Sequence, residues 1–208
     1  MNDNPFADWC DEHDTVRLPP PPPWRRSAYR PANGGEAQHV APIPTNQTWI
    51  GEHYLPSTRT IAEVREAILL RRPLLILGDV QGPWALACFI SCKLGLGSVI
   101  GWSLSKSSSI IDGLYSYDRE AMERERALAV RRDDIPPYSI ARYIKLGPLG
   151  TALLPTPRPR VLVIDDIDSA SEELSTNLEL LISSGEFQIP QLVAASRNGE
   201  ELHEISVI

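Results

Sequence analysis

The hydrophobic and polar positions along this chain form two kinds of segment, short apolar runs and longer stretches with a helical period. The apolar runs are Leu74–Leu77, Val99–Trp102 and Val161–Ile164, and the first and last of them are apolar at every position. Strands that are buried on both faces of a parallel sheet have this pattern. We therefore predict three strands, and we expect Leu74–Leu77 and Val161–Ile164 to be central and adjacent.

Helices are predicted between and after these strands. They cover the residues from 60 to the Arg-Arg-Pro sequence at 71–73, residues 83–94, 119–132 and 138–144, and a segment that begins at residue 169. Thr60–Glu63 and Ser169–Glu172 both match the capping box that marks a first helical turn. The last helix is expected to bury the apolar face made by Leu174, Leu178, Leu181 and Ile182. The order strand, helix, strand, helix predicts a doubly wound α/β fold.

Residues 1–44 show neither period. The five consecutive prolines Pro19–Pro23 fix the backbone near the polyproline II conformation and supply no N–H donors. We predict that residues 1–44 form a disordered, proline-rich leader and that residues 45–208 form the folded core. Two functions suit the leader, a stiff spacer or a docking peptide for the aromatic-lined groove of a proline-recognising domain.

The charge of the chain bears on its partners and its location. A formal net charge of −7 gives no basic surface of the kind that attracts phosphate backbones, which disfavours binding to nucleic acid. No apolar run reaches the roughly 18 residues of a membrane-spanning helix. The acidic start, residues 1–4, differs from the basic first part of a signal peptide. We expect a cytoplasmic protein that binds neither nucleic acid nor membrane.

Cysteine and histidine spacing does not point to a metal site. The cysteines Cys10, Cys88 and Cys92 contain no Cys-x-x-Cys pair, which favours free thiols in a reducing compartment. The four histidines lie in four separate segments, without the spacing of zinc ligands.

Two of the predicted strands end in residues that are typical of a nucleotide site. Leu74–Leu77 leads into Gly78-Asp79-Val80-Gln81-Gly82, where a phosphate-binding loop belongs, and Val161–Ile164 leads into Asp165-Asp166, where acids that bind magnesium belong. If the two strands are adjacent and parallel, Gly78 and Asp165 meet at their carboxyl ends.

Seven segments in this order resemble the MoxR-like AAA+ ATPases, specifically the bacterial branch with a proline-rich leader. The resembling segments are Leu18–Arg26, Leu70–Leu75, Leu94–Gly97, Asp112–Asp118, Ile144–Leu154, Arg160–Asp168 and Gly185–Pro190. The resemblance implies a P-loop NTPase fold, a three-layer sandwich with a central parallel sheet. It also implies a ring-forming ATPase that remodels a partner protein with ATP and Mg²⁺ as cofactors.

The resemblance assigns site residues by position. The nucleotide-binding positions are Gly78, Asp79, Gln81, Gly82, Pro83 and Trp84, the magnesium position is Asp165 and the catalytic position is Asp166. Several of these residues depart from the family pattern. The loop is one residue short, Pro83 stands where the phosphate-binding Lys belongs and Trp84 where the magnesium-binding Ser or Thr belongs. Asp166 replaces a Glu that polarises the attacking water and is one methylene shorter.

The family pattern continues beyond the segments found here. It includes a strand that carries a sensor of the γ-phosphate, an arginine finger and a helical lid. None of these is recognised before Ile208. The folded core is therefore expected to be an AAA+ fold that is incomplete at its C-terminal end.

Two functions follow from these observations. The first is a catalytically impaired, partner-binding module of the MoxR type, which the altered loop and the proline-rich leader favour. The alternative is an ATP-binding and ATP-hydrolysing protein remodeller whose site is completed by another chain. Expected partners are proteins, either a ring of AAA+ subunits or a proline-recognising domain.

Overall fold

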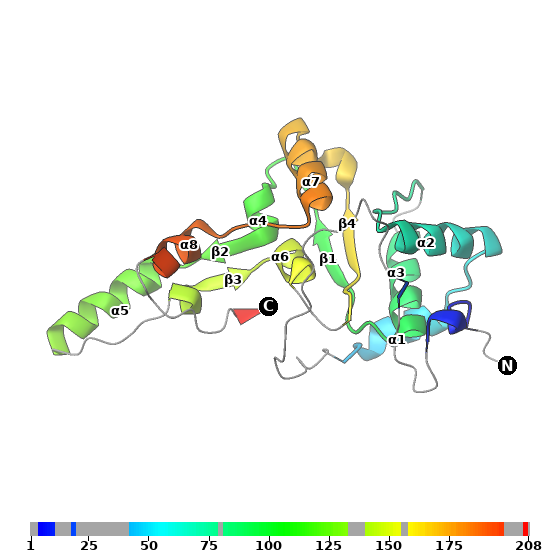
Figure 1. Ribbon diagram of the computed structural model, residues 1–208, viewed down its shortest axis with the longest axis horizontal. Coiled ribbons are helices and arrows are strands. Elements are labelled where there is room, and N and C mark those ends of the chain that lie inside the picture. The colour runs from blue at the N-terminus through cyan, green and yellow to red at the C-terminus, as the bar shows by residue number, and fades with distance from the viewer. Residues whose placement is uncertain are drawn as a thin grey trace. The chain divides into compact units, whose positions relative to one another are not determined.

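The computed structural model describes residues 4–10, 18–19, 42–78, 81–132, 140–154, 158–197 and 206–207, which form a mixed α/β structure (Figure 1). Within these ranges, no helix is both long and apolar enough to cross a bilayer. The elements are the 3-10 helix η1 (Ala7–Trp9), α1 (Thr45–His53), α2 (Thr58–Leu70), α3 (Gln81–Leu94), β1 (Ile100–Ser103), α4 (Ile110–Leu114), β2 (Tyr115–Tyr117), α5 (Arg119–Arg132), η3 (Ile140–Tyr143), β3 (Ile144–Leu146), α6 (Pro148–Leu153), β4 (Leu162–Asp165), η4 (Ile167–Ser169), α7 (Glu172–Ser184), α8 (Pro190–Arg197) and β5 (Ser206–Val207).

The chain divides into two compact units. The first unit contains residues 1–103 and 155–165, and the second contains residues 104–154 and 166–208. This division falls inside residues 45–208, which the sequence pattern predicts to be one folded core.

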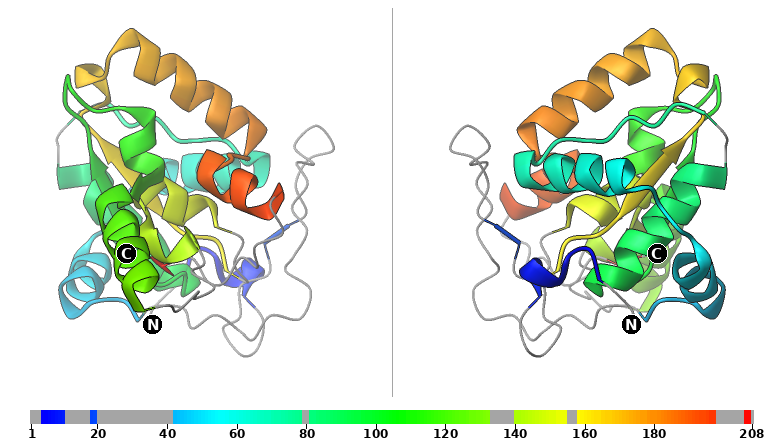
Figure 2. Two further views of the ribbon diagram at one scale, coloured as in Figure 1. Left: turned by 90° about the vertical axis from the view of Figure 1, so that its left-hand side faces the viewer. Right: turned by 90° about the vertical axis from the view of Figure 1, so that its right-hand side faces the viewer.

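A parallel pair of strands forms the sheet of the first unit. Ile100 of β1 is in register with Leu162 of β4, and Ser103 is in register with Asp165. Helix α3 lies alongside β4 (Figures 1 and 2). The strands predicted at residues 99–102 and 161–164 are therefore confirmed, each shifted by one residue. The parallel arrangement follows from the long connection between them.

The strand predicted at Leu74–Leu77 is wrong. Residues 72–77 have no regular secondary structure, and all four side chains of the run are exposed. The neighbour of β4 is β1 and not this run. An apolar run becomes a buried strand only when another strand satisfies its backbone groups, and within the described ranges no strand pairs with residues 74–77.

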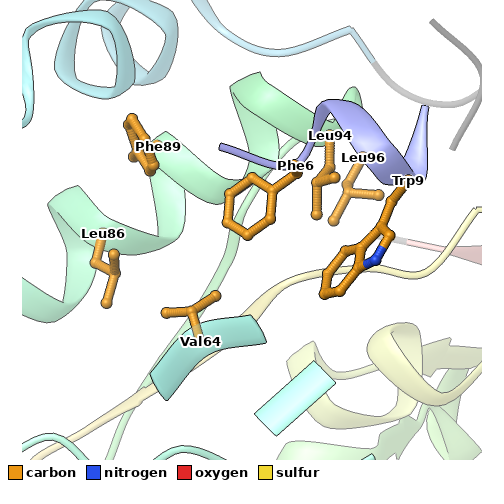
Figure 3. Close-up of a cluster of buried hydrophobic side chains, with 7 residues drawn as sticks. All are labelled: Phe6, Trp9, Val64, Leu86, Phe89, Leu94 and Leu96. Carbon is orange, nitrogen blue, oxygen red and sulfur yellow. The ribbon is translucent and has the colours of Figure 1, made fainter. Parts of the chain in front are cut away.

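The main hydrophobic cluster of the first unit includes two residues from the predicted leader. Phe6 and Trp9 are buried among side chains of α2 and α3 and the loop after α3 (Figure 3). The full cluster consists of Phe6, Trp9, Val64, Leu86, Phe89, Leu94 and Leu96. The expectation of disorder across residues 1–44 is therefore wrong for residues 4–10. Two aromatic side chains in a short polar segment supply enough apolar area to anchor it.

Polar contacts hold this N-terminal segment against two helices. Arg65 of α2 donates hydrogen bonds to the carbonyl oxygen of Pro5 at 2.6 Å and to the carboxylate of Asp8 at 2.5 and 2.7 Å. Its guanidinium also lies 4.5 Å from the ring centroid of Trp9. The hydrogen bond from Arg65 lowers the pKa of Asp8. Asn4 donates to the carbonyl oxygen of Lys93 at the end of α3, at 3.0 Å.

Helix α1, which the pattern did not predict, packs closely on α3. A Cβ atom placed on Gly51 would lie 2.6 Å from the carbonyl oxygen of Cys88, so only glycine permits this approach. The buried amide of Gln47 pairs with the backbone of Val99, donating to its carbonyl oxygen at 3.2 Å and accepting from its N–H at 2.9 Å. The amide thus satisfies both backbone groups of the residue that precedes β1.

Helix starts differ from the predicted ones by a few residues. The N-cap of α2 is Ser57, whose hydroxyl accepts from the N–H of Thr60, and the N-cap of α7 is Ser171, whose hydroxyl accepts from the N–H of Leu174. Both helices thus use the serine whose hydroxyl reaches the backbone N–H three residues on. In α7 the predicted apolar face is confirmed, because Leu174, Leu178 and Leu181 are buried and Ile182 is partly buried.

A small mixed sheet forms the second unit. β3 pairs antiparallel with β2 and parallel with β5. The core contains Ile144, Leu146 and Ile189. Residues 140–144 were predicted as part of a helix, but residues 140–146 form a short 3-10 turn and then β3, because Ile144 and Leu146 alternate with exposed Lys145 at the period of a strand. The charged helix predicted at 119–132 is confirmed as α5.

We predict that Phe6→Ala lowers the free energy of unfolding by about 3–5 kcal/mol, because it removes a fully buried ring from the main cluster. Urea unfolding followed by circular dichroism measures this change. The control is Leu55→Ala, whose side chain is 90% exposed and whose loss is expected to stay within about 0.5 kcal/mol. Equal unfolding midpoints for the two variants would contradict the anchored N-terminal segment.

Candidate functional site

The degenerate loop, residues 78–84, begins with a glycine in an unusual conformation. Gly78 is exposed and has a φ of +136°, which side chains rarely permit. Asp79, a predicted nucleotide-binding residue, lies outside the described residues. A Cβ atom placed on Gly78 or on Gly82 would meet no described atom within 4 Å. The backbone at these two glycines is therefore open to an approaching group.

The second half of this loop belongs to α3. The helix starts at Gln81, so Gly82, Pro83 and Trp84 all lie in its first turn. A proline is accepted there because the first N–H groups of a helix have no partner within the helix. Pro83 consequently lies in the first turn of α3 without donating a hydrogen bond, and it brings no charge.

Trp84 packs against the sheet of the first unit. A Cβ atom placed on Gly101 of β1 would lie 3.1 Å from Cζ3 and 3.6 Å from Cη2 of its indole. The ring is partly buried and contacts the cluster made by Ala87, Cys88, Val99 and Val163. The position that the family resemblance assigns to a small hydroxyl therefore carries part of the hydrophobic core.

The two acids after the third predicted strand differ in their surroundings. Asp165 is the last residue of β4 and is partly buried opposite Ser103. Asp166 is exposed and has left-handed backbone angles, φ 57° and ψ 41°, and its carbonyl oxygen accepts from the N–H of Ser169 at 2.9 Å. Asp tolerates this conformation better than most residues. Asp166 thus starts the turn η4.

The strand pairing expected to bring Gly78 beside Asp165 is not formed. In the parallel pair of the first unit, Ser103 is the residue opposite Asp165, and Leu74–Leu77 pairs with no described strand. The sequence pattern could not reveal this, since both apolar runs have the residue types of a central strand.

The residues present do not fit a magnesium–nucleotide complex. A phosphate-binding loop needs a lysine for the β- and γ-phosphates and a hydroxyl for the metal. Here the first position is an uncharged proline inside a helix, and the second is an indole packed on Gly101. Of the two positions that the resemblance assigns to magnesium, the loop hydroxyl and the acid at the end of the strand, only the second, Asp165, keeps a residue type that binds the metal.

The cysteines of α3 are core residues. Cys88 is buried, and burial together with the neighbouring Cys92 raises the pKa of its thiol. Burial also raises the pKa of Cys92. Thiols with raised pKa values stay protonated near neutral pH and are weak nucleophiles and weak metal ligands. Among the residues described, no group of three potential ligands is arranged to hold a metal ion.

The sequence pattern missed an apolar pocket of the first unit, with a volume of about 300 Å³. Leu74 lines it together with Val161 and Leu162, and α2 and α3 contribute further walls. Arg71, Arg72 and Arg160 also line it. The complete lining is Leu18, Val64, Ala67, Ile68, Arg71, Arg72, Leu74, Ile90, Leu94, Leu96, Pro159, Arg160, Val161 and Leu162. The pocket contains no residue of the degenerate loop and neither Asp165 nor Asp166.

Two of these arginines are partly withdrawn from water. Burial lowers the pKa of both Arg71 and Arg160. Arg71 has a left-handed backbone conformation at the end of α2 and donates to the carbonyl oxygens of Ile68 at 2.9 Å and Pro19 at 2.6 Å. In the sequence, the adjacent Arg71 and Arg72 were a signal only for the end of a helix.

The comparisons with known proteins identify no relative. No protein-family model, no curated protein and no solved structure matches the chain.

We predict that Trp84→Ser lowers the free energy of unfolding by about 2 kcal/mol, less than the ~3–5 kcal/mol of a fully buried tryptophan because the ring is only partly buried. The measurement is the urea midpoint. The matched control is Trp49→Ser, whose side chain is 61% exposed and whose expected loss is within about 0.5 kcal/mol. A Trp84→Ser protein as stable as the control would show that the indole has no packing role.

Proposed function

We propose that this chain is a catalytically impaired module of the MoxR-like AAA+ type that binds a protein partner. The observation that carries the proposal is the contact of the Trp84 indole with Gly101. An indole offers no oxygen ligand for magnesium, and this one is packed against the sheet, so the position cannot hold the metal. Restoring the hydroxyl there would cost stability, which supports a role for this helix in structure.

An exposed apolar surface supports the binding part of the proposal. Leu74–Leu77 exposes four consecutive aliphatic side chains. Contiguous apolar surface of this kind is typical of sites of protein association. The surface lies in the first unit, as do β4 and the degenerate loop.

One observation favours the alternative function, an ATP-hydrolysing remodeller completed by another chain. Asp165 stands at the carboxyl end of a parallel strand, where open α/β sheets bind ligands. In that case the second chain must supply the cation and the hydroxyl that this loop lacks. A test with the isolated chain and with nucleotide separates the two functions.

We predict that millimolar ATP with Mg²⁺ leaves the melting temperature of the chain unchanged and that no phosphate is released. A nucleotide at 100 times its dissociation constant would stabilise the fold by about 2.7 kcal/mol, which a thermal shift assay detects. Asp165→Asn is the matched variant. A thermal shift that appears in the original chain and disappears in Asp165→Asn would establish a nucleotide site and overturn the proposal in favour of the ATP-dependent remodeller.

We also predict that the double substitution Leu75→Asp and Leu77→Asp weakens the retention of a partner protein at least tenfold. The unfolding midpoint is expected to stay within about 0.5 kcal/mol, because both side chains are exposed. Affinity capture with the immobilised chain, followed by mass spectrometry, identifies partners and compares their amounts.

The control for this capture is a second pair of exposed leucines. Leu128→Asp with Leu180→Asp introduces the same two charges on α5 and α7. This control is expected to retain the partner. Equal loss with both double variants would mean that added charge, and not the surface at residues 74–77, determines retention.

A further inference from the structure

The outer edge of β4 is open in the described part of the first unit. The sheet has the order β1-β4, so β4 makes ladder hydrogen bonds on one edge only. Residues 161–164 are apolar on both faces, as in a strand with neighbours on each side. An edge strand of this type offers unpaired backbone N–H and C=O groups to another chain.

The exposed run at residues 74–77 has the side-chain alternation of a strand. Leu74 and Ile76 are 39% and 40% exposed, whereas Leu75 and Leu77 are 69% and 87% exposed. An alternation with a period of two means that successive side chains point to opposite sides. The run therefore has the side-chain arrangement of a strand, although its backbone forms no ladder of hydrogen bonds with a described strand.

The apolar pocket lies between these two features. Leu74 contributes one part of its lining, and Val161 and Leu162 contribute another. Its lining includes Leu162, the first residue of β4, and no residue of β1, so the pocket lies at the start of β4. Its volume of about 300 Å³ is at the lower limit for ligand sites, which suits a few aliphatic side chains of a peptide.

The charges in the lining indicate what else the occupant carries. Arg71, Arg72 and Arg160 all contribute to it, and no Asp or Glu does. Arg71 donates to the carbonyl oxygens of Ile68 and Pro19, and Arg72 is exposed. An occupant with a carboxylate next to its apolar residues would complement this charge.

We propose that the outer edge of β4 and residues 74–77 accept an added strand from the protein partner, an extended peptide with alternating aliphatic side chains and an adjacent acidic residue. The backbone of this peptide pairs with β4, and its aliphatic side chains enter the pocket. The inference rests on the proposed partner-binding function and specifies the kind of segment that is bound.

The experiment uses the full chain and fluorescent ten-residue peptides of alternating Val and Thr. Two such peptides are acidic. The first carries a pair of Glu residues at its amino end, and the second carries the pair at its carboxyl end. A control peptide has Pro in place of a central Val, which removes an N–H and interrupts pairing. Fluorescence anisotropy measures binding, and hydrogen exchange measures the protection of amides in residues 74–77 and 162–165.

We expect at least one acidic peptide to bind and to slow exchange in residues 162–165, and the proline peptide to bind at least tenfold more weakly. Leu75→Asp should weaken binding at least tenfold, and Arg72→Glu should weaken it and reduce its salt dependence. Leu128→Asp, which introduces the same charge on α5, should bind as the original chain does.

Three results would overturn this inference. The first is the failure of both acidic peptides to bind. The second is that the proline peptide binds as tightly as the acidic peptides. The third is a dimer, detected by sedimentation, that Leu75→Asp disrupts while no peptide binds. The last result would identify a second copy of this chain as the occupant. Each leaves the proposed absence of nucleotide binding intact, whereas a thermal shift with ATP and Mg²⁺ would remove the proposed function itself.

Discussion

The burial of α3 is the constraint on which the first unit depends. Gly51 lets α1 approach the backbone of this helix, Phe6 packs against its apolar side, and Trp84 in its first turn covers Gly101. The sheet is in turn joined to α1 by the amide of Gln47, which satisfies the backbone of Val99. When a helix is packed on several sides, its first turn has few alternative conformations, because a close-packed interior leaves side chains little space to move. The conformation of residues 81–84 is therefore tied to packing.

Elements whose pattern is local were predicted well from the sequence. The charged helix α5, the buried face of α7 and the strands β1 and β4 follow from periodicity. What the sequence could not reveal depends on partners distant in the chain. Leu74–Leu77 has the residue types of a buried strand, yet burial needs a neighbouring strand. Phe6 and Trp9 lie in a polar, proline-rich region, and their anchoring requires a cavity between α2 and α3 that only the folded chain has.

The prediction of functional residues at the candidate site meets the same limit. The family resemblance assigned the nucleotide-binding residues by position. The replacements Pro83 and Trp84 already disfavoured nucleotide binding. The reason for Trp84, its contact with Gly101, needed the structure. The pocket beside β4 had no sequence signal at all, because its apolar residues come from separate elements and its arginines resemble a helix end. Charge and cavity become informative only when the fold brings such residues together.

The first unit is made of two segments that lie far apart in the sequence, and this affects the order in which the chain folds. Its helices come from residues before 95, but β4 follows most of the second unit in the sequence. During synthesis the aromatic anchor and α1 to α3 emerge early, and β1 then waits for its partner until residue 165 has been made. Pairings between distant residues are slow because the intervening chain must be ordered first. The apolar side chains of β1 and α3 thus lack the cover of β4 during this interval of translation, and exposed apolar surface of this kind promotes the aggregation of a nascent chain.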